Sequence, residues 1–264
     1  MSHSIVHWNG NKWSFSGFHR EPNSNKNRAI LVCGGPSLST IDVSKLRGPG
    51  KAVFGLNNTY PYVVPDYWIG MDDPRCYDRN VLFEGFPKFL RGGLADRNFQ
   101  GVDPKELHNV HFINCKSGPQ EEIFARAKYA SKTFIWQNNV MAVAMNLLLA
   151  MGFKEIYIIG CDFDNSKQDY FEGDVKLGDK AKERNTRLYG NLYNWLRWLT
   201  DECAKKDIKL HTLSKESKIS KFMPYMSLLD LNKKVEQELP EPGVLYNAFD
   251  LQEMRRQKGA PEPK

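Results

Sequence analysis

Short apolar runs bounded by glycine or polar residues recur along this chain, and segments with helical spacing of apolar positions separate several of them. An unbroken apolar run of this length is typical of a strand that is buried on both faces of a parallel sheet. The predicted strands are residues 29–33, 51–56, 66–71, 89–92, 110–114, 156–161 and 207–213.

Helical spacing of apolar positions predicts five helices. The clearest is 138–151, a strongly apolar segment that Gly152 ends as a C-cap. This helix leads into the buried run 156–161, and the succession of helix and buried strand predicts an α/β fold with a parallel sheet. The five predicted helices are residues 38–46, 121–130, 138–151, 184–205 and 217–229.

Three segments of different character divide the chain. Residues 1–28 are predicted to form a hairpin and a polar linker, because Asn-Gly at positions 9 and 10 suits a tight turn. The hairpin either packs Trp8 and Trp13 on the body as an edge hairpin or stacks its aromatic residues on nucleic-acid bases. Residues 29–235 form the predicted α/β domain, and the proline-rich, charged residues 236–264 are expected to be a flexible tail.

The composition narrows the class of protein. Of the 264 residues, 41% are hydrophobic and 26% are charged, an ordinary balance for a soluble globular protein. No apolar run approaches the roughly 18 residues of a membrane span, and no signal-peptide core is present. The 5 scattered cysteines favour a reduced, cytoplasmic setting, and the net charge of +6 mildly favours anionic partners.

A glycine-containing loop, Gly34-Gly35-Pro36-Ser37, follows the first predicted buried strand. The two glycines allow a tight turn and close approach of the backbone to a ligand, and Ser37 is placed to cap the helix that follows. Free amides in such a loop form a cradle for a phosphate at the carboxyl end of a sheet. The alternative is a plain turn from strand to helix.

Amide side chains follow the second predicted strand. Asn57 and Asn58 come directly after residues 51–56, where an amide can both donate and accept hydrogen bonds. The two asparagines are therefore candidates for contacts to a nucleobase or ribose. A turn cap is the alternative.

Acidic residues follow two further strands. Asp72 and Asp73 come after residues 66–71 and offer a candidate base or an Asp-Pro turn. Asp162 and Asp164 follow 156–161 and offer a site for Mg²⁺ or Mn²⁺ bridging a nucleotide diphosphate. Alternatively, Asp162 is a structural cap, and Asp164 belongs to the long polar loop 164–182, which is predicted to be a lid.

Four blocks of the sequence resemble the bacterial sialyltransferases of glycosyltransferase family 42. They are residues 30–42, which contain the glycine loop, 53–58, 150–163, and 208–213 with Ser217 and Phe222 after it. Archaeal 6-hydroxymethyl-dihydropterin diphosphokinases share the Gly-Pro-Ser-Leu sequence of the first block. The resemblance implies a single doubly wound, mostly parallel sheet that is Rossmann-like and GT-A-like, with helices on both faces and a lid loop.

The resemblance also implies which residues hold a nucleotide donor. The glycine loop would lie beside the nucleotide, a lid tyrosine would hold the donor phosphate, and a pair of asparagines lies near the family's base-binding segment. The donor-binding residues implied in this way are Gly34, Gly35, Pro36, Ser37, Asn57, Asn138, Asn139 and Tyr170. Asn58 and Asp162 are further donor-binding candidates because they lie at strand ends.

Two departures from the family pattern change the expected chemistry. Gly34 stands where the family has an asparagine near the reaction centre. Residues 187–193 contain no histidine, although the family has its general base there. Tyr189 in that segment would need a greatly lowered pKa to act as a base near neutral pH. The other candidates for this role are the carboxylates of Asp72 and Asp164.

We therefore expect a glycosyltransferase that moves a sugar from a nucleotide-activated donor to an acceptor hydroxyl by direct displacement. A diphosphokinase that uses ATP and Mg²⁺ is the alternative enzyme. If the protein is not an enzyme, the alternative is a non-catalytic nucleotide- or nucleic-acid-binding module. The expected acceptor is a glycan or a hydroxylated pyrimidine base flipped out of DNA.

Overall fold

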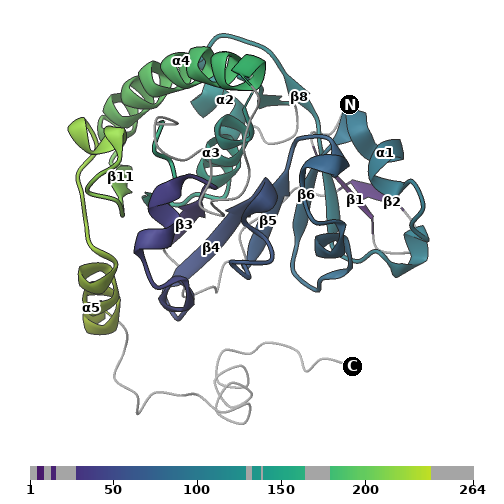
Figure 1. Ribbon diagram of the computed structural model, residues 1–264, viewed down its shortest axis with the longest axis horizontal. Coiled ribbons are helices and arrows are strands. Elements are labelled where there is room, and N and C mark those ends of the chain that lie inside the picture. Colours follow the sequence, from purple (N-terminus) through teal and green to yellow (C-terminus); the bar gives the residue numbers. More distant parts are fainter. Residues whose placement is uncertain are drawn as a thin grey trace, which may run out of the picture.

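The computed structural model describes residues 5–8, 13–15, 28–128, 133–137, 139–163 and 179–238, and one sheet forms its centre (Figure 1). Seven strands of this described part run parallel, which confirms the predicted fold class. Every strand predicted from an apolar run is present. In spatial order they are β11 (Lys209–Thr212), β10 (Glu155–Ile159), β3 (Arg28–Val32), β4 (Lys51–Leu56), β5 (Tyr67–Gly70), β6 (Lys88–Arg91) and β7 (Val110–Ile113).

Helices cover both faces of this sheet. The α-helices of the described residues are α1 (Ala95–Phe99), α2 (Glu122–Lys128), α3 (Val140–Ala150), α4 (Asp179–Ala204) and α5 (Leu228–Glu238). Leu31 and Phe54 pair across β3 and β4 and pack in one core cluster with residues of α3 and α4. Ile30 and Val53 pack in a second cluster with residues of α5. Figure 1 shows α3 and α4 together and α5 apart from them, so the sheet is doubly wound as predicted.

The predicted central helix is confirmed as α3. Its side chains are apolar almost all round, and a helix of that kind is stable only when it is buried. Asn139 is the N-cap, because its Oδ1 accepts a hydrogen bond of 2.7 Å from the amide of Met141. Gly152 follows the helix with φ +78°, the left-handed conformation expected of a glycine at the end of a helix.

The single helix predicted over 38–46 is wrong. Two short 3₁₀ helices, Pro36–Thr40 and Val43–Lys45, occupy this segment. Asp42 separates them, since its Oδ1 accepts hydrogen bonds from both the amide and the hydroxyl of Ser44. Such local side-chain bonds compete with helical hydrogen bonds. Ser37 therefore lies inside the first 3₁₀ helix and does not cap an α-helix.

The helical region predicted over 217–229 is also different. A short 3₁₀ helix, Lys218–Lys221, lies there, and α5 begins only at Leu228. Helix α5 extends three residues beyond the predicted end of the domain at 235, because its apolar face, including Leu231 and Val235, is buried against the sheet. The rest of the predicted tail lies outside the described residues.

Short elements extend the sheet at its other end. The predicted hairpin is confirmed as β1 (Ile5–Trp8) and β2 (Trp13–Phe15), and β1 pairs antiparallel with β7, so it is an edge hairpin of the same sheet. Beyond the carboxyl end of β7, β8 (Cys115–Lys116) pairs in parallel with β9 (Phe134–Ile135). No helix in the described part of the chain combines the length and apolar character that crossing a bilayer requires.

Candidate functional site

The strand order reverses between β3 and β10. From β3 the chain builds the sheet in one direction as far as β7, and it then returns to add β10 and β11 on the other side of β3. Open α/β sheets bind ligands in the crevice outside the carboxyl ends of the strands at such a switch point. The glycine loop follows β3 and Asp162 follows β10, so the structure brings these two predicted segments together at this point.

Hydrogen bonds donated by backbone amides join the glycine loop to the residues that follow β10, and we call this set of bonds the clasp. The amide of Gly35 donates to the carbonyl of Gly160 at 2.7 Å, and the amide of Gly160 donates to Ser37 Oγ at 3.2 Å. The amide of Ser37 donates to Asp162 Oδ2 at 2.8 Å. A Cβ on Gly35 would lie 2.5 Å from the Gly160 oxygen and 2.6 Å from Asp162 Oδ2. Glycine is therefore required at position 35 for the approach of the two segments.

This clasp changes the interpretation of the glycine loop. The amides of Gly35 and Ser37 are engaged within the protein, and Pro36 has no amide hydrogen, so these three residues offer no free amide to a phosphate in this arrangement. The carboxylate of Asp162 lies where a bound anion would accept from Ser37. The donor-binding role of residues 34–37 stays a prediction, with Gly34 half-buried at the start of the loop.

Asp162 has the position of the structural cap that the sequence left open as an alternative. Its Oδ2 accepts from Ser37, while its Oδ1 is buried and accepts no hydrogen bond from the described residues. Within those residues, no three His, Cys, Asp or Glu side chains gather as a metal site would require. Asp164, the second predicted metal ligand, lies outside the described residues, so the metal site stays a prediction.

Asn57 and Asp72 meet at the ends of the next two strands. Asn57 Nδ2 donates to Asp72 Oδ2 at 2.5 Å, and Asn57 Oδ1 accepts from the amide of Met71 at 3.3 Å. The carbonyl of Asn57 accepts from Trp68 Nε1 at 2.9 Å, and φ of Asn57 is +42°. Three contacts to β5 and its end thus hold this asparagine in a left-handed conformation. Asn58 is half-buried beside it.

Asp73 is a turn residue. It caps the following 3₁₀ helix by accepting from the amide of Arg75, and it also pairs with the guanidinium groups of Arg75 and Arg97, each at 2.8 Å. Hydrogen bonds from Arg75, followed by that from Arg97, hold the pKa of the Asp73 carboxyl well below its usual range. A carboxylate held in this way is a poor proton acceptor. Of the predicted acidic pair, Asp72 is exposed and remains the candidate base.

Tyrosines of α4 line the other side of the switch point. The ring of Phe163, directly after Asp162, has its centroid 5.8 Å from that of Tyr189 and 6.1 Å from that of Tyr193. Tyr193 also packs edge-on against Phe222 at 5.1 Å. Tyr189 is half-buried and lies near the crevice, but its role as a base stays a prediction.

The remaining predicted residues divide into two groups. Asn139 caps α3 through its Oδ1, so this oxygen is engaged, and its donor-binding role stays a prediction. Asn138 and Tyr170 lie outside the described residues.

Cys161 at the switch point is unsuited to nucleophilic chemistry. A hydrogen bond with Cys33 and then burial raise the pKa of the Cys161 thiol well above its ordinary value. The thiol is therefore protonated near neutral pH, and a protonated thiol is a poor nucleophile. Cys161 lies in the core cluster with Leu31 and Phe54, and Cys33 packs against this cluster.

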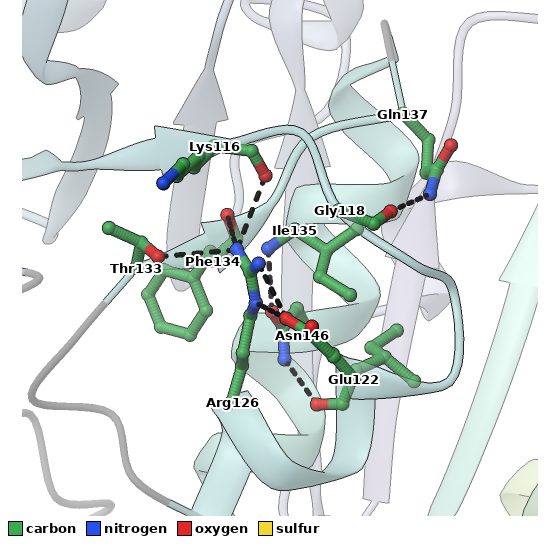
Figure 2. Close-up of polar contacts among 10 residues, drawn as sticks. Lys116, Gly118, Glu122, Arg126, Thr133, Phe134, Ile135, Gln137 and Asn146 are labelled. Carbon is green, nitrogen blue, oxygen red and sulfur yellow. Dashed lines mark hydrogen bonds and ion pairs between the residues drawn. The ribbon is translucent and has the colours of Figure 1, made fainter.

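Sequence reasoning missed a polar cluster around Arg126, which Figure 2 shows. Its guanidinium bonds Glu122 Oε2 at 2.6 Å and reaches the strand β9 that follows α2. From the neighbouring helix, Asn146 accepts from the amide of Ile135 at 3.0 Å and donates to the carbonyl of Ile123 at 2.9 Å. The i, i+4 spacing of Glu122 and Arg126 was the one available signal. The other acceptors of Arg126 are the Lys116 and Phe134 carbonyls and Thr133 Oγ1.

Comparison with known proteins gives distant structural likenesses. No protein-family model and no curated protein matches the chain. The sialyltransferase CstII from Campylobacter jejuni, in complex with cytidine-5′-monophosphate, is similar with a TM-score of 0.46 and 16% identity over 77% of this chain and 86% of that one. The monofunctional alpha-2,3-sialyltransferase Cst-I from the same organism gives 0.44 and 14% over 90% and 96%.

A further structure is CST-II in complex with a trisaccharide acceptor and CMP, with a TM-score of 0.46 and 16% identity over 77% of this chain and 87% of that one. Likenesses at this level are too distant to assign an activity to this chain. The α/β fold itself rests on the strand order and helix layers described above.

Proposed function

We propose that this chain is a glycosyltransferase that moves a sugar from a nucleotide-activated donor to an acceptor hydroxyl. One observation carries the proposal. Three blocks that resemble the sialyltransferase family, around Ser37, Asn57 and Asp162, follow the adjacent strands β3, β4 and β10 and so end at one edge of the sheet. The edge includes the switch point at which doubly wound folds bind nucleotides.

The proposed chemistry is a direct displacement at the anomeric carbon of the donor sugar. The acceptor oxygen forms a bond to this carbon while the bond from the carbon to the phosphate oxygen breaks. The electron pair leaves with the nucleotide phosphate, and the proton of the acceptor hydroxyl passes to Asp72. Asn57 holds the Asp72 carboxylate through a hydrogen bond of 2.5 Å.

Asp72 is better suited to this role than its neighbour. The Asp72 carboxylate is exposed and accepts a hydrogen bond from the Asn57 side chain, and two arginines engage the carboxylate of Asp73. An arginine partner stabilises the ionised carboxylate and weakens it as a base. The proton therefore goes to Asp72 in this mechanism.

A divalent cation fits one feature of the site. Asp162 has a buried carboxylate oxygen that accepts no hydrogen bond from the described residues, and such oxygens are preferred ligands of Mg²⁺ and Mn²⁺. Asp162 and Asp164 would hold such an ion, which when bound would neutralise the charge of a nucleotide diphosphate.

The test begins with a thermal-shift screen of nucleotide sugars, free nucleotides and ATP, because a ligand of the native state raises its melting temperature. Consumption of each stabilising nucleotide sugar is then measured for the wild type and for Asp72→Asn. We expect the substitution to lower turnover by about 10²–10⁴-fold, the usual contribution of a general base. ATP as the sole stabilising nucleotide would contradict the proposal and favour a diphosphokinase.

A matched control is Asp201→Asn. Asp201 is exposed near the end of α4. This helix leads into the amino end of β11, whereas Asp72 follows the carboxyl end of β5. Equal turnover in the wild type and in Asp72→Asn would remove Asp72 from the mechanism. Equal losses in Asp72→Asn and Asp201→Asn would show that the effect is not specific to the site.

A further inference from the structure

An arginine and a tryptophan stack beyond the carboxyl end of β6. The guanidinium of Arg91, the last residue of β6, lies 4.8 Å from the ring centroid of Trp136, which directly follows β9. Both side chains are half-buried, so each keeps part of its surface open to solvent. Planar guanidinium groups and aromatic rings attract one another in this geometry.

Arg91 differs from five other described arginines in its partners. Five described arginines each pair with a carboxylate: Arg28 with Glu155, Arg47 with Asp66, Arg75 and Arg97 with Asp73, and Arg126 with Glu122. Within the described part of the chain, Arg91 forms no such ion pair. A guanidinium fork without an acidic partner is available to bind a carboxylate or a phosphate of a ligand.

The pair lies close to the proposed base. Gly70 of β5 pairs with Leu90 of β6, so continuation of this register places Met71 beside Arg91 and Asp72 one residue beyond. Neighbouring strands are about 4.8 Å apart. A ligand that contacts Arg91 is therefore about one strand spacing from the end of β5, on the side of Asp72 that faces away from the switch point.

We propose that Arg91 and Trp136 form the acceptor subsite and that the acceptor is a sugar ring carrying an anionic group, either a carboxylate or a phosphate. This rests on the proposed function. The guanidinium binds the anionic group, the solvent-exposed part of the indole contacts the sugar ring, and a hydroxyl of the same acceptor points to Asp72.

The surroundings of Trp136 keep the subsite in place. Its amide donates to the Lys116 carbonyl at 3.1 Å. The next side chain, Gln137, donates to the Gly118 carbonyl at 3.3 Å (Figure 2). Arg126 binds the adjoining pair of strands, β8 and β9, by donating to the carbonyls of Lys116 and Phe134. A platform fixed in this way loses little conformational freedom when a ligand binds.

The experiment compares three matched acceptors: p-nitrophenyl β-D-glucoside, the corresponding glucuronide, and the glucoside 6-phosphate. Their binding to the protein without donor is measured by ligand-observed NMR titration. We expect the wild type to bind at least one anionic compound about tenfold or more tightly than the neutral one, as a charge-assisted hydrogen bond provides. Which compound is preferred distinguishes a carboxylate from a phosphate.

Three variants separate the contributions. Arg91→Gln should abolish the preference for the anionic compounds, and Trp136→Ala should weaken all three, while Arg197→Gln, on the exposed face of α4, should match the wild type. An unchanged preference in Arg91→Gln, or no preference in the wild type, would overturn the subsite.

Failure of the proposed function has a different signature. In that case no nucleotide sugar is consumed by the wild type, whatever the binding titration gives. Consumption of a nucleotide sugar together with equal binding of the glucoside and both anionic compounds would leave the glycosyltransferase intact and refute only the anionic acceptor.

Discussion

Replacing Gly35 by alanine tests whether the clasp between β3 and β10 holds the switch point together. The added Cβ would lie 2.5 Å from the Gly160 oxygen and 2.6 Å from Asp162 Oδ2, so the two segments must move apart. Overpacking of this kind costs about 1–3 kcal/mol. Loss of the hydrogen bond from Ser37 to the Asp162 carboxylate costs about 1.5–3 kcal/mol more.

These two effects together predict a loss of about 2.5–6 kcal/mol in the free energy of unfolding. For a chain of this size that corresponds to a fall of roughly 10 °C in melting temperature. Differential scanning calorimetry and urea unfolding measure both quantities. Asp162→Asn, which keeps the side-chain volume but removes the charge, should be destabilised less than Gly35→Ala.

Gly93→Ala is the matched control, because a Cβ there meets no atom within 4 Å. Its stability should stay within about 1 kcal/mol of the wild type and should rise if the backbone accepts alanine. A melting temperature of Gly35→Ala equal to that of Gly93→Ala would refute the clasp.

Three further predictions follow from the structure. Burial acts to raise the pKa of Glu155, but hydrogen bonds from Lys234, Tyr157 and Arg28 lower it from 4.5 to about 2. The ionised carboxylate therefore stabilises the fold above pH 4.5, and this contribution of about 3 kcal/mol is lost as the pH falls towards 2. Urea unfolding across this pH range should show that Glu155→Gln loses less free energy of unfolding than the wild type. An equal dependence of the free energy of unfolding on pH in the two proteins would count against this role of Glu155. If Asp162 and Asp164 hold an ion, a chelator should abolish donor consumption and Mn²⁺ should restore it, whereas full activity in chelator would exclude the metal site. If Tyr189 is not the base, Tyr189→Phe should keep the pH profile of turnover, and loss of the rise in turnover with increasing pH would reassign the role to Tyr189.

The sequence predicts the sheet well, because a strand buried on both faces must be apolar throughout and glycine or asparagine marks its end. The segment 38–46 has the apolar spacing of a helix, but the Asp42 side chain bonds Ser44 and ends the regular structure there. Local spacing does not reveal that competition. The last three residues of α5 were assigned to the tail, since the partners that stabilise the end of this helix, such as Arg28 for Glu238, are 210 positions away.

The site is predicted only in part for the same reason. Asn57 and Asp72 were each identified from a strand end, yet their hydrogen bond depends on the neighbouring positions of β4 and β5. The amides of the glycine loop were predicted to be free, and a residue 125 positions later occupies one of them. Arg91 and Trp136 carried no sequence signal, because a stack between the ends of separate strands has no characteristic spacing.

The clasp also bears on where the proposed chemistry takes place. At the switch point, the amide of Ser37 already holds the carboxylate of Asp162, so the loop contributes fewer free donors than its glycines indicate. The candidate residues Asn57, Asp72 and Arg91 lie one, two and three strands further along the carboxyl edge. The proposed base, Asp72, follows β5. If Asp72 takes the proton, the proposed reaction centre lies along the carboxyl edge of the sheet from the switch point at β3 and β10 towards β5.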